Sequence, residues 1–180
     1  MVYVLLGTGF EETEAIAPID LLRRAGVEVL TVGIGSKTVY GGHGIGVEAD
    51  ITLEEMDLTN LEMIVLPGGL GGVASIRASK AAMDAIAFAA ENGRYVAAIC
   101  AGPTVLADLH ITDGRKVTCY PGCESSMGTA DYIPNEACMQ DNNVITGTSA
   151  GCAIAFGLKL IAALKGENAA KTVAEQIVIR

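Results

Sequence analysis

The 180-residue chain has no tryptophan, only two histidines, and 12 lysines and arginines against 21 aspartates and glutamates. The formal net charge at pH 7 is therefore −9. The basic residues are scattered, and the only adjacent ones are Arg23-Arg24 and Arg115-Lys116. A chain without a basic patch has little to attract the phosphates of nucleic acid or of an anionic membrane. We therefore expect no specific nucleic-acid partner and no membrane partner.

The sequence also lacks a visible signal peptide and a hydrophobic run long enough to span a membrane. The segment 81–109 comes closest, but it is interrupted by Asp84, Glu91, Arg94 and Asp108. These absences predict a cytoplasmic location, where cysteines stay reduced. The five cysteines, which are Cys100, Cys119, Cys123, Cys138 and Cys152, include no C-x-x-C pair and have no neighbouring histidine. We therefore expect no metal site and no cofactor.

Apolar residues, by contrast, are abundant. They make up 51% of the chain, charged residues make up 18%, and the mean hydropathy is +0.42. The length suits one domain with a sizeable core, spanning residues 1–180. So apolar a composition also predicts that a partner subunit covers part of the surface.

Short apolar runs alternate with helical patterns along the whole chain. We expect strands at 2–6, 28–33, 63–66, 95–99 and 116–119, and helices at 12–25, 79–92, 149–164 and 168–178, with a further helix starting at Pro103. Hairpins are expected at 38–49 and 137–146, and a flexible glycine-rich loop after Leu66. This alternation predicts an α/β fold, a mostly parallel sheet with helices on both faces. In such sheets the functional crevice lies at the carboxyl ends of the strands, here at 7–14, 67–72 and 100–103.

Cys100 directly follows the apolar run 95–99 and precedes Ala-Gly-Pro. A cysteine in this position is either a small apolar filler or the nucleophile of a strand-to-helix elbow. The positive end of the helix dipole and the free backbone N–H groups would favour the reactive thiolate. Because three loops converge at this edge of the sheet, we favour the functional interpretation.

Acidic residues open the first helix. The helix dipole alone explains Glu11 and Glu12. Glu14 lies about one turn further and could point into the crevice. Beside a thiolate it would need to be protonated, which crowding by a second negative charge and apolar walls permits. It could then poise the thiol or shuttle a proton, although capping of the helix is a sufficient alternative.

Two backbone N–H groups could form an oxyanion hole. They belong to Gly69, in the Pro-Gly-Gly segment, and to Ala101, directly after the cysteine. The alternative for Gly68 and Gly69 is a loop that merely needs positive φ. The histidines offer little, because His43 lies among glycines in a turn and His110 lies near a helix end. We therefore read both as structural or solvated residues and expect no Cys–His pair.

Taken together, these segments resemble the ThiJ/PfpI superfamily, and most closely its DJ-one (parkinsonism-associated deglycase) branch. The resemblance covers nearly the whole chain and is carried by 11–26, 65–69, 97–103, 116–118 and 147–151. It implies a single ThiJ/PfpI (class I glutamine amidotransferase-like) domain with a flavodoxin-like three-layer sandwich, forming a homodimer. It also implies site roles: Cys100 as an oxidisable nucleophile, Glu14 as its protonated partner, Gly69 and Ala101 as oxyanion donors, and Gly68 and Tyr120 in the pocket.

One departure from the family pattern bears on the chemistry. Many members have a histidine before the proline that is here Pro121, and this chain has Tyr120. A tyrosine hydroxyl cannot serve as a general base near neutral pH. A Cys–His protease is therefore disfavoured, and Glu14 would have to move the protons.

Three functions follow from these observations. The first is a cysteine-dependent enzyme acting on small reactive carbonyls, as a glutathione-independent glyoxalase or a deglycase of glycated proteins or nucleotides. The second is a non-enzymatic redox sensor, in which Cys100 is oxidised and Cys119 or Cys123 acts as the resolving thiol. The third, a redox-regulated chaperone, rests only on the apolar composition and the resemblance. No role can be assigned to Cys138 or Cys152.

Overall fold

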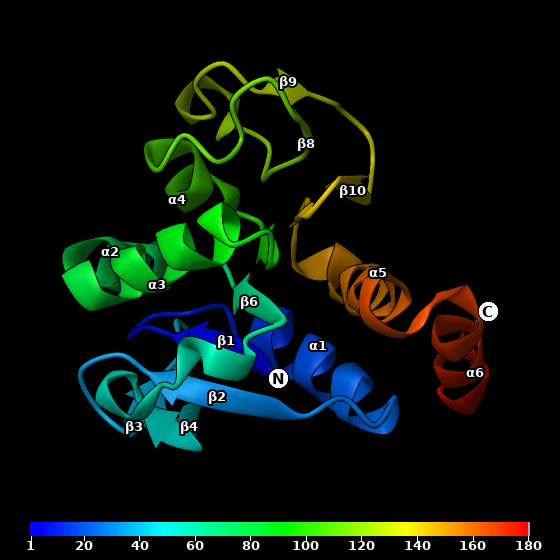
Figure 1. The fold of residues 1–180 in the computed structure, drawn as a ribbon, viewed down its shortest axis with the longest axis horizontal. Coiled ribbons are helices and arrows are strands. Elements are labelled where there is room, and N and C mark those ends of the chain that lie inside the picture. Colours follow the sequence, from blue (N-terminus) through cyan, green and yellow to red (C-terminus); the bar gives the residue numbers. More distant parts are fainter. Residues whose placement is uncertain (180) are drawn as a thin grey trace.

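A seven-stranded sheet forms the middle layer of the structure, a computed structural model that describes residues 1–179 (Figure 1). The strand order is β10-β11-β7-β6-β1-β2-β5, and every neighbouring pair is parallel except β10 with β11. The strands are β1 (Val2–Leu6), β2 (Val29–Gly33), β5 (Ile51–Thr52), β6 (Met63–Leu66), β7 (Tyr95–Ile99), β10 (Cys138–Asp141) and β11 (Val144–Gly147). The α/β class expected from the alternating pattern is confirmed.

Both faces of the sheet are covered, which explains why its central strands are apolar throughout. Successive side chains of a strand point to opposite faces. Thus Val2, Val4 and Leu6 of β1 belong to one hydrophobic cluster, whereas Tyr3 and Leu5 belong to the other. The result is the expected three-layer sandwich of the flavodoxin-like kind.

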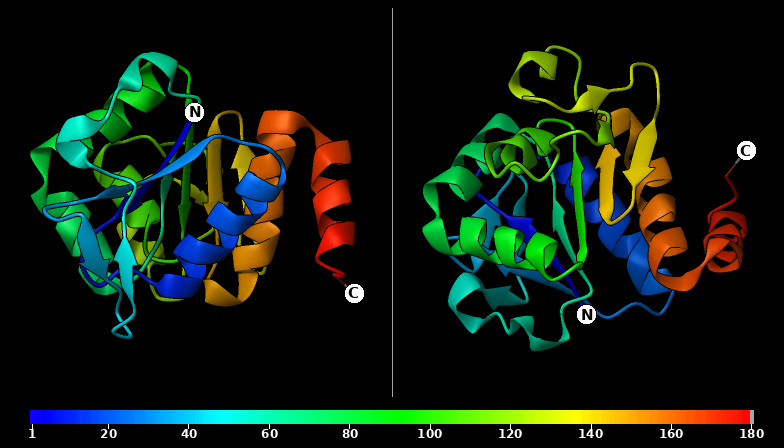
Figure 2. Two further views of the ribbon diagram at one scale, coloured as in Figure 1. Left: turned by 90° about the horizontal axis from the view of Figure 1, so that it is seen from below. Right: turned by 45° about the horizontal axis from the view of Figure 1, so that its top comes forward.

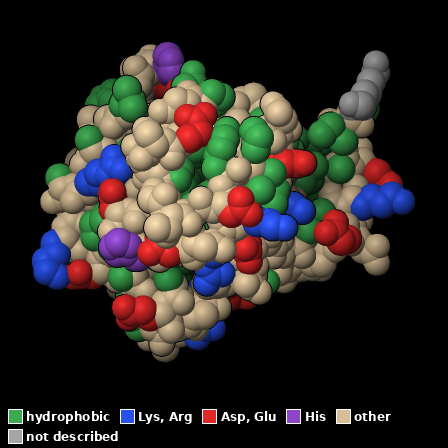
Figure 3. All heavy atoms as spheres, turned by 90° about the horizontal axis from the view of Figure 1, so that it is seen from above, with side chains coloured by type: hydrophobic (Ala, Val, Ile, Leu, Met, Phe, Trp, Pro, Cys, Tyr) green, Lys and Arg blue, Asp and Glu red, His purple; other side chains and the backbone are tan. Residues whose placement is uncertain are grey.

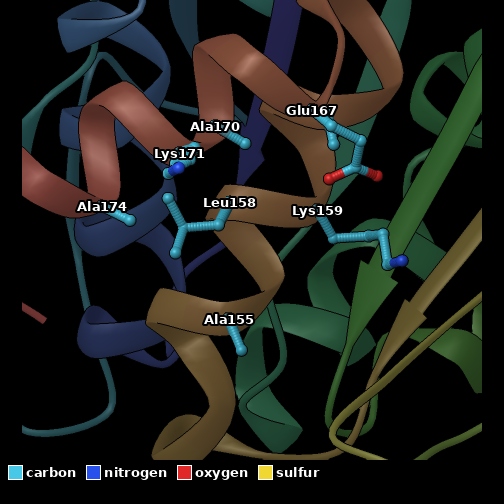
Figure 4. A pocket seen from close by; sticks show the side chains of 8 residues that line it. Ala155, Leu158, Lys159, Glu167, Ala170, Lys171 and Ala174 are labelled. Atoms are coloured by element: carbon cyan, nitrogen blue, oxygen red, sulfur yellow. The ribbon is translucent and has the colours of Figure 1, made fainter. Parts of the chain in front are cut away.

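The helices divide between these two clusters (Figures 1 and 2). One face is covered by α1 (Glu12–Arg24), α5 (Ala153–Lys165) and α6 (Glu167–Gln176), and the other by α2 (Leu70–Ala78), α3 (Lys80–Glu91) and α4 (Pro103–Asp108). The outermost helix, α6, packs on α5 across a shallow groove lined mainly by short side chains (Figure 4). No helix within residues 1–179 combines the length and apolar content needed to cross a membrane.

Smaller elements decorate the sandwich. The hairpin β3 (Thr38–Tyr40) and β4 (Gly46–Glu48) is antiparallel, and β8 (Lys116–Val117) pairs in parallel with β9 (Asp131–Tyr132). Four short 3-10 turns complete the chain: η1 (Leu53–Glu55), η2 (Leu58–Asn60), η3 (Glu124–Ser126) and η4 (Ala150–Cys152). On the face shown in Figure 3, lysines and arginines are scattered among acidic and apolar side chains, as their spacing in the sequence predicts.

The loop expected after Leu66 is present at residues 67–69, but its expected extension through Gly71 and Gly72 is wrong, because α2 begins at Leu70 and includes both glycines. These glycines provide close approach rather than flexibility. A Cβ on Gly72 would lie 2.7 Å from the Cα of Phe10, and one on Gly71 would lie 2.9 Å from the carbonyl oxygen of Thr8. The helix therefore rests directly on the backbone of the loop between β1 and α1.

Two element boundaries also differ from expectation. The helix expected from residue 149 begins at Ala153, because residues 150–152 form the 3-10 turn η4. The strand expected at 116–119 ends at Val117, since the backbone N–H of Thr118 is hydrogen-bonded to the side chain of Thr146 instead of continuing the ladder. Neither difference moves the segments that form the crevice.

Candidate active site

Cys100 lies at a sharp turn between β7 and α4. Its φ is +65°, a conformation that residues other than glycine rarely adopt. Its N–H donates to the carbonyl of Gly147 (3.0 Å), and its carbonyl accepts from the N–H of Tyr120 (2.9 Å). Gly102 is required next to it, because a Cβ there would lie 2.8 Å from the carbonyl oxygen of Leu66. The surrounding backbone thus holds Cys100 in a strained elbow, a feature that concentrates at functional sites.

The carboxyl group of Glu14 lies beside this cysteine. Glu14 is only 1% exposed, and its Oε2 accepts a hydrogen bond from the N–H of Gly68 (2.8 Å). A Cβ on Gly68 would lie 2.5 Å from Glu14 Oε2 and 2.7 Å from Cys100 Cβ. The glycine therefore allows the carboxyl and the thiol to meet. Within the described chain, Glu14 Oε1 is buried without a hydrogen-bond partner, and the Cys100 thiol influences the pKa of the same carboxyl group.

The two side chains compete for a proton. Burial raises the pKa of Glu14 above its usual range, although hydrogen bonds from Cys100 and Gly68 oppose this. Burial and the negative charge of an ionised Glu14 raise the pKa of Cys100 to about 12. The backbone N–H groups of the elbow do favour thiolate, as expected, but burial and the carboxylate outweigh them. When Glu14 keeps its proton, its negative charge no longer contributes to the raised pKa of the thiol.

The backbone N–H groups of Ala101 and Gly69 oppose the rise in the pKa of Cys100. Gly69 is the residue before α2 and has a φ of +86°, and a Cβ there would lie 2.4 Å from the carbonyl oxygen of Gly9. Only glycine therefore fits at this position. Two such donors can stabilise an oxygen that becomes negative on an atom bonded to the sulfur.

These groups open into a pocket of about 530 Å³. The predicted residues Cys100, Glu14, Gly69, Ala101 and Tyr120 all line it, and Gly68 lies directly behind the carboxyl of Glu14. Among the other lining residues, Glu11 and Leu70 lie in segments expected at the crevice, and Cys123 is one of the two expected resolving thiols. His43 and the segment Ser149, Ala150 and Gly151 were not expected in the pocket. Tyr120 is 49% exposed, so its hydroxyl is positioned to meet a ligand but not buried as a reacting group.

His43 is the largest departure from expectation. It lies in the turn between β3 and β4 and its side chain is 70% exposed, as a turn residue would be. Its Nδ1, however, lies 2.8 Å from Oε2 of Glu12, a buried carboxylate. Oε1 of Glu12 accepts from the N–H of His43 (2.8 Å) and of Ile45 (3.4 Å). Neither histidine spacing nor periodicity could have revealed this pair, because it forms only when the hairpin folds over the start of α1.

Glu12 and His43 each shift the pKa of the other. Burial would raise the pKa of Glu12, but hydrogen bonds from the His43 ring and from nearby backbone N–H groups lower it to about 2. The hydrogen bond to Glu12 and the negative charges of Glu11 and Glu12 raise the pKa of His43. Ligand atoms of Glu11, Glu12 and His43 lie within 4.8 Å of one another. Since both oxygens of Glu12 already accept N–H groups, we assign the cluster as a hydrogen-bonded pair and not as a metal centre.

The other cysteines lie in different environments, and all five are free thiols. Cys119 is fully buried with Val117 and Met127, and burial raises its pKa to about 12. Cys123 is partly exposed and lines the same pocket as Cys100. Of the two expected resolving thiols, only Cys123 therefore shares a cavity with Cys100.

Comparisons with known proteins agree with this geometry. A model of the DJ-1/PfpI family matches residues 1–163. Protein dj-1beta of Drosophila melanogaster is 33% identical over 178 residues, covering 98% of this chain and 95% of the relative. Its crystal structure matches with a TM-score of 0.95 at 31% identity, covering 99% of this chain and 97% of that one.

Two further relatives bear on chemistry. A Pyrococcus abyssi protein named a deglycase is 32% identical over 143 residues, covering 78% of this chain and 86% of the relative. A structure of oxidized DJ-1 from Toxoplasma gondii matches with a TM-score of 0.91 at 31% identity, covering 98% of this chain and 97% of that one. The residues matched by the family model include all those that line the pocket.

Proposed function

The chain belongs to the DJ-1/PfpI family, and on this basis we propose that it is a cysteine-dependent enzyme acting on small reactive carbonyls, of the glutathione-independent glyoxalase or deglycase type. One observation supports this proposal above the others: a cysteine in a strained elbow lies beside a buried carboxyl group, one oxygen of which accepts no hydrogen bond within the described chain. The relative named a deglycase points in the same direction.

The geometry accounts for each step from methylglyoxal to lactate. The sulfur of Cys100 adds to the aldehyde carbon, and the N–H groups of Gly69 and Ala101 hold the resulting oxyanion. Glu14 donates its proton to that oxyanion and, now ionised, removes the proton from the same carbon and returns it to the neighbouring carbon through an enediol. Water hydrolyses the thioester and releases lactate, so one water is consumed and no external oxidant is needed. Tyr120 can hydrogen-bond the substrate but is too weak a base to replace Glu14.

A direct assay tests the proposal. Purified protein, with its thiols reduced and without glutathione, is incubated with methylglyoxal, and lactate is measured over time. Formation of lactate above the protein-free rate is the expected result. No lactate from protein whose Cys100 titrates as a free thiol would contradict the enzyme proposal and favour redox sensing.

The position of Cys123 favours redox sensing as a second candidate function. Peroxide would oxidise the Cys100 thiolate to a sulfenic acid with release of hydroxide, and the Cys123 thiol would then displace water to form a disulfide. Backbone hydrogen bonds link both cysteines to Tyr120. The Tyr120 N–H donates to the carbonyl of Cys100, and the Tyr120 carbonyl accepts from the N–H of Cys123 (2.9 Å each). The oxidized Toxoplasma relative supports a family capacity for oxidation.

We expect one equivalent of hydrogen peroxide to produce a Cys100–Cys123 disulfide, measured by peptide mapping under non-reducing conditions. Cys119→Ser should leave this disulfide intact, because Cys119 is buried outside the pocket. Cys123→Ser should instead leave Cys100 as sulfenic or sulfinic acid. Sulfinate at Cys100 with Cys123 untouched in the wild type would eliminate the resolving role of Cys123.

The proposal includes a homodimer in the cytoplasm. A groove of about 660 Å³ runs between α1, α5 and the C-terminal segment, and is lined largely by apolar side chains. Ile16, Ile154 and Ile179 in this groove are 44%, 38% and 53% exposed. We assign it to a second copy of the chain, because α1 also carries Glu14 and the apolar composition predicts a covered face.

Replacing Ile16 with lysine is expected to convert a dimer into a monomer, because a charge would be buried in the interface. Light scattering coupled to gel filtration measures the change as a halving of mass. Phe88→Lys is the matched control, since Phe88 is 38% exposed on α3 across the sheet. A wild-type monomer, or an Ile16→Lys protein that remains dimeric, would refute this interface.

A further inference from the structure

The hairpin that carries His43 is held to the start of α1 by more hydrogen bonds than a solvated turn requires. Backbone hydrogen bonds fasten the hairpin to the loop between β1 and α1, from Gly9 to Tyr40 and from Gly42 to Phe10 (2.8 Å each). A Cβ on Gly41 would lie only 2.3 Å from the carboxyl group of Glu12. The hairpin is therefore shaped around this carboxylate, which in turn holds the backbone N–H and the ring of His43.

Burying an ionised carboxylate is unfavourable unless its hydrogen bonds are satisfied. Glu12 is 6% exposed and its hydrogen bonds come mainly from the turn that carries His43. A carboxylate that binds one ring nitrogen of a histidine fixes the ring's tautomer and orientation. With Nδ1 bonded to Glu12, Nε2 is the nitrogen left for a ligand, and His43 lines the same pocket as Cys100.

We propose that His43 donates a proton to the amine leaving group when the pocket processes an adduct between methylglyoxal and an amine. The inference rests on the proposed deglycase function and assigns a catalytic residue to it. Glu14 is buried beside the sulfur, whereas His43 is exposed at the opening of the pocket, where the amine part of an adduct extends toward solvent. Glu14 is therefore assigned the proton transfers next to the sulfur, and His43 the proton transfer to the amine.

The step balances as follows. The adduct is an aminocarbinol, in which nitrogen and a hydroxyl share one carbon. The Cys100 thiolate forms a C–S bond to that carbon as the C–N bond breaks, and the electron pair of the C–N bond moves to nitrogen. Nitrogen takes the proton from Nε2 of the His43 imidazolium, and a neutral amine leaves. The hemithioacetal that remains is the one formed from free methylglyoxal. The proton of Glu14 then passes through water to the neutral His43, which recharges the imidazole and leaves the carboxylate that acts as base, so the later steps are shared.

The charged groups around the ring favour its protonated form. Glu11 and Glu12 face it from the start of α1, with Glu11 Oε2 3.6 Å from Nδ1. The remaining titratable groups of the pocket lining are Glu14, Cys100, Tyr120 and Cys123, and the lining contains no lysine or arginine. Because only the imidazolium can donate, adduct hydrolysis should decline as pH rises through the raised pKa of His43.

The test compares two substrates, free methylglyoxal and its aminocarbinol with N-acetylarginine, across a range of pH. In His43→Gln we expect kcat for the adduct to fall about 100-fold, a typical contribution of a general acid, while conversion of free methylglyoxal stays within about twofold. The alkaline decline seen with the adduct should disappear in this variant. In His43→Ala, added imidazole should restore part of the adduct activity, which a merely structural role would not permit. His110→Gln is the matched control, because His110 is exposed at the end of α4 and pairs with Asp113.

The outcomes are distinguishable. If the wild type releases lactate from neither substrate, the proposed function fails and the role of His43 fails with it. If the wild type is active and His43→Gln hydrolyses the adduct at the wild-type rate, only the role of His43 is overturned. Equal losses on both substrates, without rescue by imidazole, would also overturn it, because they would indicate a hairpin that merely supports the pocket.

Discussion

Cys100→Ala is expected to abolish lactate formation from methylglyoxal, with a loss of about 10⁴-fold or more, the scale at which enzymes lose rate without their nucleophile. Without the sulfur, no covalent intermediate forms, and the N–H groups of Gly69 and Ala101 have no bonded oxyanion to stabilise. The measurement is initial lactate release at saturating methylglyoxal, with protein that has been checked for folding by circular dichroism.

The control for this result is Cys138→Ala. Cys138 is the first residue of β10. It packs against the hydrophobic cluster on the sheet face covered by α1, α5 and α6, and it does not line the pocket. Its variant should keep the wild-type rate, which shows that the loss is specific to one thiol. Lactate formation that persists in Cys100→Ala would refute the covalent mechanism, whatever the fate of the other proposals.

Glu14→Gln is expected to have two effects of opposite direction. The thiol should become easier to ionise, because glutamine cannot place a negative charge beside the sulfur, and that charge contributes to the raised pKa of Cys100. Lactate formation should nevertheless fall by about 10²–10⁴-fold, because the amide cannot carry a proton between the two substrate carbons. A more reactive thiol together with a weaker enzyme would separate the role of Glu14 in proton transfer from its effect on the nucleophile.

Two measurements check this prediction. The rate of alkylation by iodoacetamide across pH reports ionisation of Cys100, and its midpoint should lie at lower pH in Glu14→Gln than in the wild type. The sign follows because removing a neighbouring anion stabilises the thiolate. Glu11→Gln is the comparison, since Glu11 lines the pocket without contacting the sulfur and should leave the midpoint nearly unchanged. Retained lactate activity, or a midpoint displaced to higher pH, would contradict the role of Glu14.

The proposed mechanism assigns proton transfer to two groups, Glu14 and His43, that lie in different environments. In the proposed mechanism Glu14 acts from a buried position, where desolvation raises its pKa. His43 acts from an exposed position, where a hydrogen bond to the buried carboxylate of Glu12 raises its pKa. Two titratable groups whose environments differ in this way can serve as separate proton carriers in one pocket. In the proposed mechanism these two groups carry the protons that Tyr120 is too weak a base to move.

Local patterns in the sequence were sufficient for most of the fold. The apolar runs of β1, β6 and β7, the amphipathic spacing of α1 and α3, and the glycines that end both helices are signals contained within a few residues. The same holds for the elbow, because a strand followed by Cys-Ala-Gly-Pro is a local signature. Parallel strands then bring their carboxyl ends to one edge, so the convergence of segments 7–14, 67–72 and 100–103 could be predicted from order alone, whereas the pairing of Glu14 with Cys100 was implied by the family resemblance.

Tertiary structure decided what depends on contacts between distant segments. Gly71 and Gly72 read as flexible in the sequence, yet they belong to α2. Only glycine fits at these positions, because the helix lies against the backbone of Thr8 and Phe10. The proton balance of Cys100 is set by burial and by a carboxylate 86 positions earlier in the chain, counted from Glu14 to Cys100, and these reverse the preference of the elbow itself. His43 acquires its partner only when the hairpin closes over Glu12. Periodicity encodes which face of an element is buried, whereas electrostatic neighbours are fixed by packing, and for this protein the chemistry resides in those neighbours.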